Sequence, residues 1–351
     1  HSNLRQLIEH LQGKIKLQPL PKENILQNLD RAYDVDFADV KGQPVARRAL
    51  EIAAAGGHSI LMMGAPGCGK TMLARRLVTI LPPVTEAEAL EITKIYSIVN
   101  MLPETESVMI ERPFRSPHHS VSASALLGGG TYPMPGEVTL SHNGVLFLDE
   151  LPEFERYTLE MLRQPLEDGE VHISRVRGTM NYPARFLLIA AGNPCPCGYL
   201  GDKFRRCTCK QKDVENYRRK ISGPLLDRFD MQINLVRVEY DELKNKATGE
   251  SSSEIRKRVV EARNVQLERF AGTGFYCNAQ MTGREVMEYC QLDEAAQKIL
   301  EKYFTALHLS ARSHDRILKV ARTIADLAGS ELIAAPHIAE AIQLRTSING
   351  Q

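Results

Sequence analysis

A glycine-rich segment between an apolar run and a helical pattern has the composition of a phosphate-binding loop. Residues 64–71 read Gly-Ala-Pro-Gly-Cys-Gly-Lys-Thr, after the apolar run 60–63 and before helically spaced apolar residues over 72–81. Glycines let backbone N–H groups converge on phosphate oxygens at a helix start, and a lysine ammonium can reach the β and γ phosphates. A glycine-rich turn without a ligand is the alternative, which the strand and helix on either side disfavour. The predicted nucleotide site is Gly64, Ala65, Pro66, Gly67, Cys68, Gly69, Lys70 and Thr71.

Polar side chains also follow two later apolar runs. Asp149 and Glu150 end the run 145–148, and Asn193 follows the run 186–191. With the Thr71 hydroxyl, the Asp149 carboxylate can hold Mg²⁺, while Glu150 can activate a water that attacks the γ phosphate. Asn193 can orient that water, because ligands of open α/β sheets bind at the carboxyl ends of the strands. The alternatives are a solvated helix cap for the two acids and an ordinary turn for Asn193.

Four of the seven cysteines crowd into fifteen residues, as the pairs Cys195/Cys197 and Cys207/Cys209. Soft thiolates in two pairs favour tetrahedral Zn²⁺, although one residue between partners is fewer than the usual two to four. Four free or oxidised cysteines in a loop are the alternative reading.

A local basic segment overlaps the cysteines. Residues 203–220 carry eight lysines and arginines against Asp213 and Glu215, and we take Arg205 and Arg206 as candidate contacts to a nucleic-acid backbone. A solvated loop is the alternative.

Composition narrows the class of protein without naming a partner. The 351 residues are 43% hydrophobic and 25% charged, which excludes a disordered chain or a fibrous repeat, and the length excludes a lone small module. Lysine and arginine number 44 against 43 acidic residues, so net charge does not indicate nucleic acid. No stretch is apolar enough to cross a bilayer, so we expect a cytoplasmic protein without a membrane partner.

The apolar runs and helical patterns predict three segments. Residues 4–11, followed by a proline-containing break, predict a linker helix within 1–35 that remains from a removed N-terminal domain. Residues 36–243 predict an α/β domain with a mostly parallel sheet, with strands at 60–63, 145–148, 186–191 and 233–238. After a polar break, residues 244–351 predict a helical domain, with helices around 255–262, 295–304, 317–327 and 338–344.

The order of these motifs is similar to a known group of ATPases. The P-loop, Asp149-Glu150, Asn193 and Ser222-Gly-Pro-Leu-Leu-Asp-Arg-Phe-Asp230 resemble the AAA+ ATPases of the magnesium chelatase and MCM helicase group. Several further segments look like the ComM (YifB-type) magnesium-chelatase-like proteins of bacteria, over 36–345: residues 112–120 (Arg-Pro-Phe-Arg-Ser-Pro-His-His-Ser), 128–130 (Gly-Gly-Gly), 136–138 (Gly-Glu-Val), 193–198 (Asn-Pro-Cys-Pro-Cys-Gly) and 321–327 (Ala-Arg-Thr-Ile-Ala-Asp-Leu).

This resemblance implies an AAA+ core followed by a helical lid domain, assembled as a homo-oligomeric ring, a hexamer, with ATP and Mg²⁺ between subunits. It implies an ATP hydrolase that remodels single-stranded or branched DNA, by helicase or branch-migration activity, in natural transformation and recombination. Arg228 would be an arginine finger for the neighbouring subunit, or else a surface ion-pair residue. Arg312, just before the first turn of a helix, would be the second sensor, with Arg316 as the competing assignment.

Two loops of the resemblance would face the ring's pore. Residues 170–180 read as a hairpin with Arg175 and Arg177 at its tip, and the segment around Arg115, His118 and His119 is similar to a second pore-side loop.

A competing function uses the same ATP residues: a chelatase-like or chaperone-like motor that acts on a protein partner without nucleic acid.

Overall fold

The computed structural model describes residues 4–16, 33–102, 108–130, 132–175, 178–239, 249–307 and 310–346. The chain divides into two units, residues 1–31 and residues 32–351. In the first unit, the predicted helix is present as α1 (Leu4–Leu11), with an Arg5–Glu9 ion pair one turn apart.

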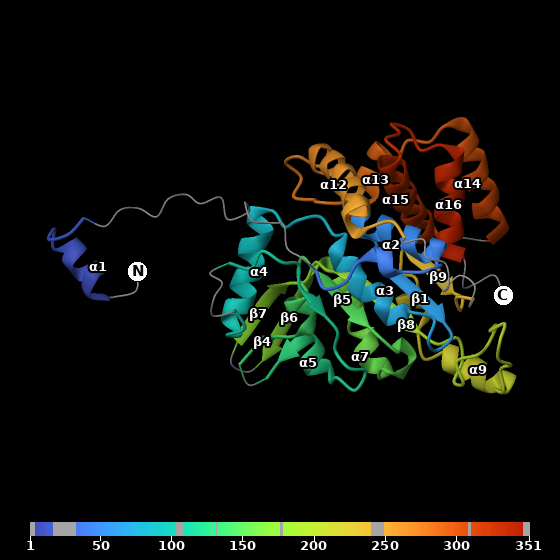
Figure 1. The fold of residues 1–351 in the computed structure, drawn as a ribbon, viewed down its shortest axis with the longest axis horizontal. Helices are drawn as coiled ribbons and strands as arrows, with labels where there is room; N and C mark the ends of the chain where they lie inside the picture. Colours follow the sequence, from blue (N-terminus) through green and yellow to red (C-terminus); the bar gives the residue numbers. More distant parts are fainter. Residues whose placement is uncertain are drawn as a thin grey trace. The chain divides into compact units, whose positions relative to one another are not determined.

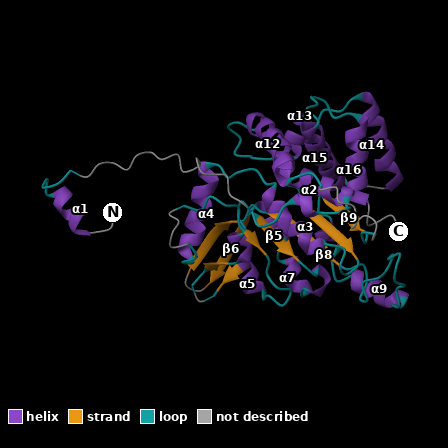
Figure 2. Cartoon of the chain, in the orientation of Figure 1, coloured by secondary structure: helices purple, strands orange, loops and turns teal. Residues whose placement is uncertain are grey.

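A five-stranded parallel sheet forms the centre of the second unit (Figure 2). Its order is β2 (Phe114–Arg115), β5 (Val145–Leu148), β8 (Leu187–Gly192), β1 (Ile60–Gly64) and β9 (Met231–Leu235). Strands β1, β5 and β8 are buried along their whole length, as expected for parallel strands covered on both faces.

Alternate side chains of the strands enter two separate cores. From β1, Ile60 and Met62 pack with α2 (Pro44–Gly56), α3 (Lys70–Arg76) and the C-terminal helices. Leu61 and Met63 face the other way, toward α5 (Ala123–Leu127) and α7 (Arg156–Glu160). The period of two along each strand therefore builds a helix–sheet–helix sandwich.

In the part of the chain that the structure describes, five α-helices follow the sheet: α12 (Ser252–Arg269), α13 (Gly283–Tyr289), α14 (Glu294–Leu307), α15 (Ala311–Leu327) and α16 (Ala335–Thr346). Helices α12 and α15 pack on α2, and α16 packs on β9 (Figure 1). The expected fold class, a parallel sheet flanked by helices and followed by a helical domain, is confirmed. The passage from one to the other, at 240–248, lies outside the described residues.

The remaining elements connect these strands and helices. They are α4 (Glu86–Ile98), β3 (Gly128–Gly129), β4 (Met134–Pro135), α6 (Glu137–Leu140), α8 (Arg163–Asp168), the hairpin β6 (Glu170–Arg175) and β7 (Gly178–Pro183), α9 (Gln211–Arg218), α10 (Gly223–Leu226) and 3₁₀ turns at Phe37–Asp39, Leu77–Thr79, Leu151–Glu153 and Asn278–Gln280. None of the helices in these described segments is both long and apolar enough to cross a membrane.

Two element boundaries differ from the sequence prediction. Strand β9 occupies Met231–Leu235 instead of 233–238, because Ile60 at the start of β1 pairs with Met231, and Val236 is left exposed. The helix after the P-loop ends at Arg76 instead of 81, where Leu77 N–H bonds to Ala74 O and the chain tightens into a 3₁₀ turn.

Candidate nucleotide and metal sites

The three predicted polar motifs meet at the carboxyl edge of the sheet. The P-loop follows β1, Asp149 follows β5, and Asn193 follows β8, which lies between those two strands. Gly67 and Gly69 have φ of +79° and +94°, a region that favours glycine. Gly69 is the N-cap residue of α3 and has no side chain, so no capping side chain engages the first N–H groups of α3, and they can bind an anion.

Lys70 lies at the centre of this edge. Its Nζ donates to Gly64 O at 2.6 Å, to Ala65 O at 3.1 Å and to Asn193 Oδ1 at 3.1 Å. Burial lowers the pKa of the Lys70 ammonium, and the charge of nearby Asp149 opposes that shift. The lysine and Asn193 are thus already in contact where a phosphate would lie.

Thr71 and Asp149 are also paired. Thr71 Oγ1 donates to Asp149 Oδ2 at 2.6 Å, and Asp149 Oδ1 accepts from the backbone N–H of Glu150 at 2.9 Å. Hydroxyl and carboxylate oxygens of this kind, together with phosphate and water, are the ligands that Mg²⁺ uses. Thr71 and Asp149, which are distant in sequence, therefore fit as part of a coordination shell for Mg²⁺.

Glu150 is held by a residue that sequence reasoning assigned to a different role. Its φ is +53°, its side chain is 55% exposed, and its Oε2 lies 3.2 Å from His119 Nδ1. His119 reaches the edge because β2 pairs with β5, so the chain leaving β2 passes over the end of the acidic strand. A two-residue strand gives no periodic signal, and nothing local in the sequence indicated this contact.

Arg228 lies at the opposite, amino edge of the sheet. Its carbonyl accepts from the hydroxyl of Ser59, the residue just before β1, at 2.8 Å. Its side chain is 5% exposed, donates to Pro224 O at 2.8 Å and pairs with Glu167, while Nε has no partner among the described residues. Burial lowers the pKa of the Arg228 guanidinium, partly opposed by Glu167. Arg228 therefore lies far from Lys70 of its own chain.

The two candidate sensor arginines, Arg312 and Arg316, differ in their exposure and in their contacts. Ser310 caps α15 by accepting a hydrogen bond from Ser313 N–H, so Arg312 lies within the first turn of α15. The sequence predicted it just before that turn. Its side chain is 73% exposed, with Nη2 4.0 Å from Glu167 Oε1. Arg316 donates to Asp230 Oδ1 at 2.5 Å and to Arg228 O at 3.0 Å. Arg316 is thus engaged in packing, and Arg312 is the accessible one.

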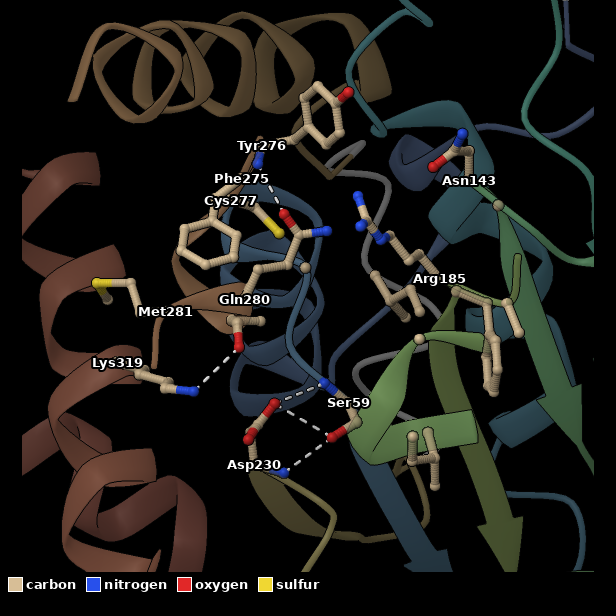
Figure 3. Close-up of a pocket in the computed structure, with 18 of the residues that line it drawn as sticks. Ser59, Asn143, Arg185, Asp230, Phe275, Tyr276, Cys277, Gln280, Met281 and Lys319 are labelled. Carbon is tan, nitrogen blue, oxygen red and sulfur yellow. Dashed lines mark hydrogen bonds between the residues drawn. The ribbon is translucent and has the colours of Figure 1, made fainter. Parts of the chain in front are cut away.

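Asp230 joins the helical domain to this amino edge. It lines a cavity of about 500 Å³ together with Arg228, Tyr276 and Lys319, and Figure 3 shows its hydrogen bonds to Ser59. Burial alone would raise the pKa of Asp230, but the Arg316 charge and the His58 ring, whose Nδ1 lies 3.5 Å from Oδ2, hold that pKa far below its usual range. The sequence showed Asp230 only as part of a motif, not as this buried anion.

The four predicted zinc ligands come together. The Sγ atoms of Cys195, Cys197, Cys207 and Cys209 all lie within 4.8 Å of one another. Cys195 Sγ is 3.4 Å from Cys197 Sγ and 3.7 Å from Cys207 Sγ. A tetrahedral zinc with Zn–S bonds of about 2.3 Å separates its sulfurs by about 3.8 Å. Four sulfur donors at this spacing fit a thiolate-bound metal. Backbone N–H groups of Thr208 and Tyr199 lower the pKa of Cys197 to about 5, whereas burial raises the pKa of Cys195.

The basic residues beside the cysteines are exposed. Arg205 donates to Tyr199 Oη at 3.0 Å and lies 4.2 Å from the centroid of that ring, while Arg206 points into solvent. Phe204, just before these two arginines, is 60% exposed. Sequence reasoning missed this aromatic side chain, although Lys-Phe-Arg-Arg at 203–206 was visible.

The remaining candidate DNA contacts have different surroundings. Arg115 forms a forked ion pair with Glu137 at 2.6 and 2.7 Å, which raises its pKa, so its charge is satisfied within the chain. The predicted hairpin is present, and Arg175 ends β6. Arg177 lies outside the described residues.

Comparisons with known proteins agree with this geometry. Residues 36–243 match the family of magnesium chelatase, subunit ChlI, and residues 249–345 match the C-terminal family of the same subunit. The chain is 48% identical over 345 residues to the uncharacterized protein YifB of Salmonella typhimurium, covering 98% of this chain and 66% of YifB. It is 45% identical over 349 residues to the competence protein ComM of Haemophilus influenzae, covering 98% and 67%.

A more distant relative is the magnesium-chelatase 38 kDa subunit of Rhodobacter capsulatus, 26% identical over 176 residues, covering 45% of this chain and 50% of that subunit. The chain spans about two thirds of the length of YifB and ComM. On the family match over both segments and on this identity, the chain belongs to the magnesium chelatase ChlI family, among its YifB- and ComM-type proteins.

Proposed function

We propose that this chain is a ring-forming AAA+ ATP hydrolase that uses ATP to remodel DNA. The observation that carries the proposal is that the two edges of the sheet hold different parts of a nucleotide site. Lys70, the Thr71–Asp149 pair, Glu150 and Asn193 gather at the carboxyl edge, while Arg228 and Arg312 lie at the amino edge. One subunit thus offers the two complementary halves of a nucleotide site.

ATP fits the carboxyl edge as substrate. The N–H groups at the start of α3 would donate hydrogen bonds to the phosphate oxygens, and Lys70 would move its ammonium from the Gly64 and Ala65 carbonyls onto the β and γ oxygens. Thr71 and Asp149 would hold Mg²⁺, which neutralises charge on the phosphates. Glu150 would take the proton of the attacking water, and Asn193 would orient that water.

The amino edge would complete the site of a neighbouring subunit. Strand β1 has five residues, about 16 Å at 3.3 Å each, which is more than twice the reach of an arginine of about 7 Å. Arg228 therefore cannot reach its own γ phosphate, and a role in hydrolysis requires a second subunit. Subunits would therefore assemble into a ring, which we propose to be a hexamer, with Arg312 as second sensor at the same interface.

The proposal that DNA is the partner depends on exposed side chains near the cysteines. Arg205, Arg206 and Phe204 combine cations with an aromatic ring on one loop, which suits a phosphate backbone and a stacked base. Hairpin arginines Arg175 and Arg177 would add contacts. The relative from Haemophilus influenzae is named a competence protein, which is consistent with work on DNA during natural transformation and recombination, by helicase or branch-migration activity. We also propose Zn²⁺ at the four cysteines.

The test is binding of forked and single-stranded DNA by the full-length protein with a non-hydrolysable ATP analogue, at increasing salt. We expect binding to weaken steeply with salt and to depend little on sequence, because the candidate contacts are to phosphates. Absence of salt-sensitive binding would overturn the DNA part and favour a motor that acts on a protein partner.

A further inference from the structure

We propose that the cysteine module, residues 195–209, is a metal-dependent support for the P-loop, so that metal loss weakens nucleotide binding. The inference rests on the proposed function in one respect, that the P-loop binds a nucleotide. Beyond that function, we infer that a metal which takes no part in ATP hydrolysis controls how tightly the P-loop binds the nucleotide.

The module begins at the nucleotide site and returns to it. Cys195 is two residues after Asn193, the residue that contacts Lys70. Gly198, with φ of +83°, lies so close to the P-loop that a Cβ there would be 2.6 Å from Pro66 Cδ. The turn closed by the cysteines therefore packs directly on the P-loop.

Arg237, just after β9, forms a second link. Its Nη2 donates to Pro66 O at 3.2 Å, and its Nε lies 3.4 Å from Asp202 Oδ2. The Asp202 side chain is 3% exposed, and its Oδ1 accepts from the backbone N–H groups of Phe204 and Arg205, each at 2.8 Å. Arg237 thereby joins the P-loop to the loop between the two cysteine pairs.

A metal is needed because the module has almost no core of its own. Among residues 195–209, all of which the structure describes, only Cys195 and Gly198 are buried. Residues that bury so little apolar surface cannot offset the conformational entropy of an ordered loop. Four thiolates on one Zn²⁺ supply that stability, since the binding free energy of a structural zinc is folding free energy. The Sγ cluster is the one group of four close thiols in the described chain.

The test measures zinc content and nucleotide affinity of the full-length protein, using elemental analysis and a fluorescent ATP analogue. We expect one zinc per chain in the native protein. Cys207→Ser with Cys209→Ser should lose the zinc and bind the analogue at least tenfold more weakly. Arg237→Ala should keep the zinc and still bind roughly tenfold more weakly, because it cuts the link and leaves the ligands.

Arg284→Ala is the matched control, an exposed arginine on α13 away from both sites, and it should bind the analogue like the native protein. The inference is wrong if the native protein carries no zinc, or if Arg237→Ala retains both zinc and native affinity. A native protein that binds no nucleotide at all would overturn the proposed ATPase itself, and this inference with it. Native binding with unaffected variants would overturn this inference alone.

Discussion

Arg228→Ala should abolish most ATP turnover while leaving nucleotide binding nearly intact. Arg228 lies beside Ser59 at the amino edge, about 16 Å of strand away from its own P-loop, so its loss removes no contact to the nucleotide in its own chain. An arginine finger acting from a neighbour contributes about 10³- to 10⁵-fold to kcat. We therefore expect a decrease of at least about 10³-fold in kcat.

The same substitution should affect folding less than catalysis. Glu167, the partner of Arg228, is 46% exposed, so water can solvate its carboxylate after the arginine is removed. Because only one partner of the ion pair is buried, its loss should cost less than the about 3–5 kcal/mol lost with a fully buried pair. A thermal unfolding curve close to the native one would separate lost catalysis from lost structure.

The assay is phosphate release by the assembled full-length protein, alone and after mixing Arg228→Ala with Lys70→Ala subunits. Mixed rings contain interfaces where an intact P-loop meets an intact arginine, so part of the activity should return. Arg228→Lys should recover little, because an ammonium lacks the guanidinium fork. A role of Arg228 in the neighbouring site is refuted if Arg228→Ala keeps kcat within tenfold of native, or if demonstrably mixed rings recover nothing.

Three further outcomes follow from the described contacts. Glu150→Gln should bind ATP and release phosphate very slowly, whereas Lys70→Ala should lose tight binding; equilibrium binding and phosphate release distinguish them, and native turnover by Glu150→Gln would refute its role as base. Asp230→Asn should lower the free energy of urea unfolding by about 3 kcal/mol at neutral pH, because it leaves the Arg316 charge without its carboxylate. Since the pKa of Asp230 is lowered in the folded state, its stabilisation is present above about pH 4 and is lost as the pH falls below that value, so the difference from native should shrink in acid; a constant difference would contradict this. Replacing Arg205 and Arg206 with alanine should reduce the slope of log affinity against log salt by about one to two and leave basal hydrolysis unchanged, measured on forked DNA; an unchanged slope would remove this loop from the DNA site.

The sequence could predict the parts of the site that follow strands. Runs of apolar residues ending in Gly64, Asp149 and Asn193 are local signals, and parallel pairing then brings their ends together. The cysteine cluster was predictable for the same reason, since its members lie within fifteen residues.

Contacts between distant segments left no such signal. His119 meets Glu150 through a strand of two residues, and Glu167 meets Arg228 across 61 positions of the chain. The buried Asp230 depends on Arg316 from a helix that begins far along the chain. Each arises from tertiary packing, where the partner is chosen by which helix covers which edge and not by spacing in the sequence.

The measurement that tests the central claim most directly is steady-state phosphate release from ATP and Mg²⁺ by the full-length protein, with and without forked DNA. We predict hydrolysis that forked DNA stimulates, and loss of both basal and stimulated rates in Lys70→Ala. Hydrolysis that is the same with and without DNA would contradict a DNA motor, and phosphate release by Lys70→Ala at the native rate would contradict the assignment of the site itself.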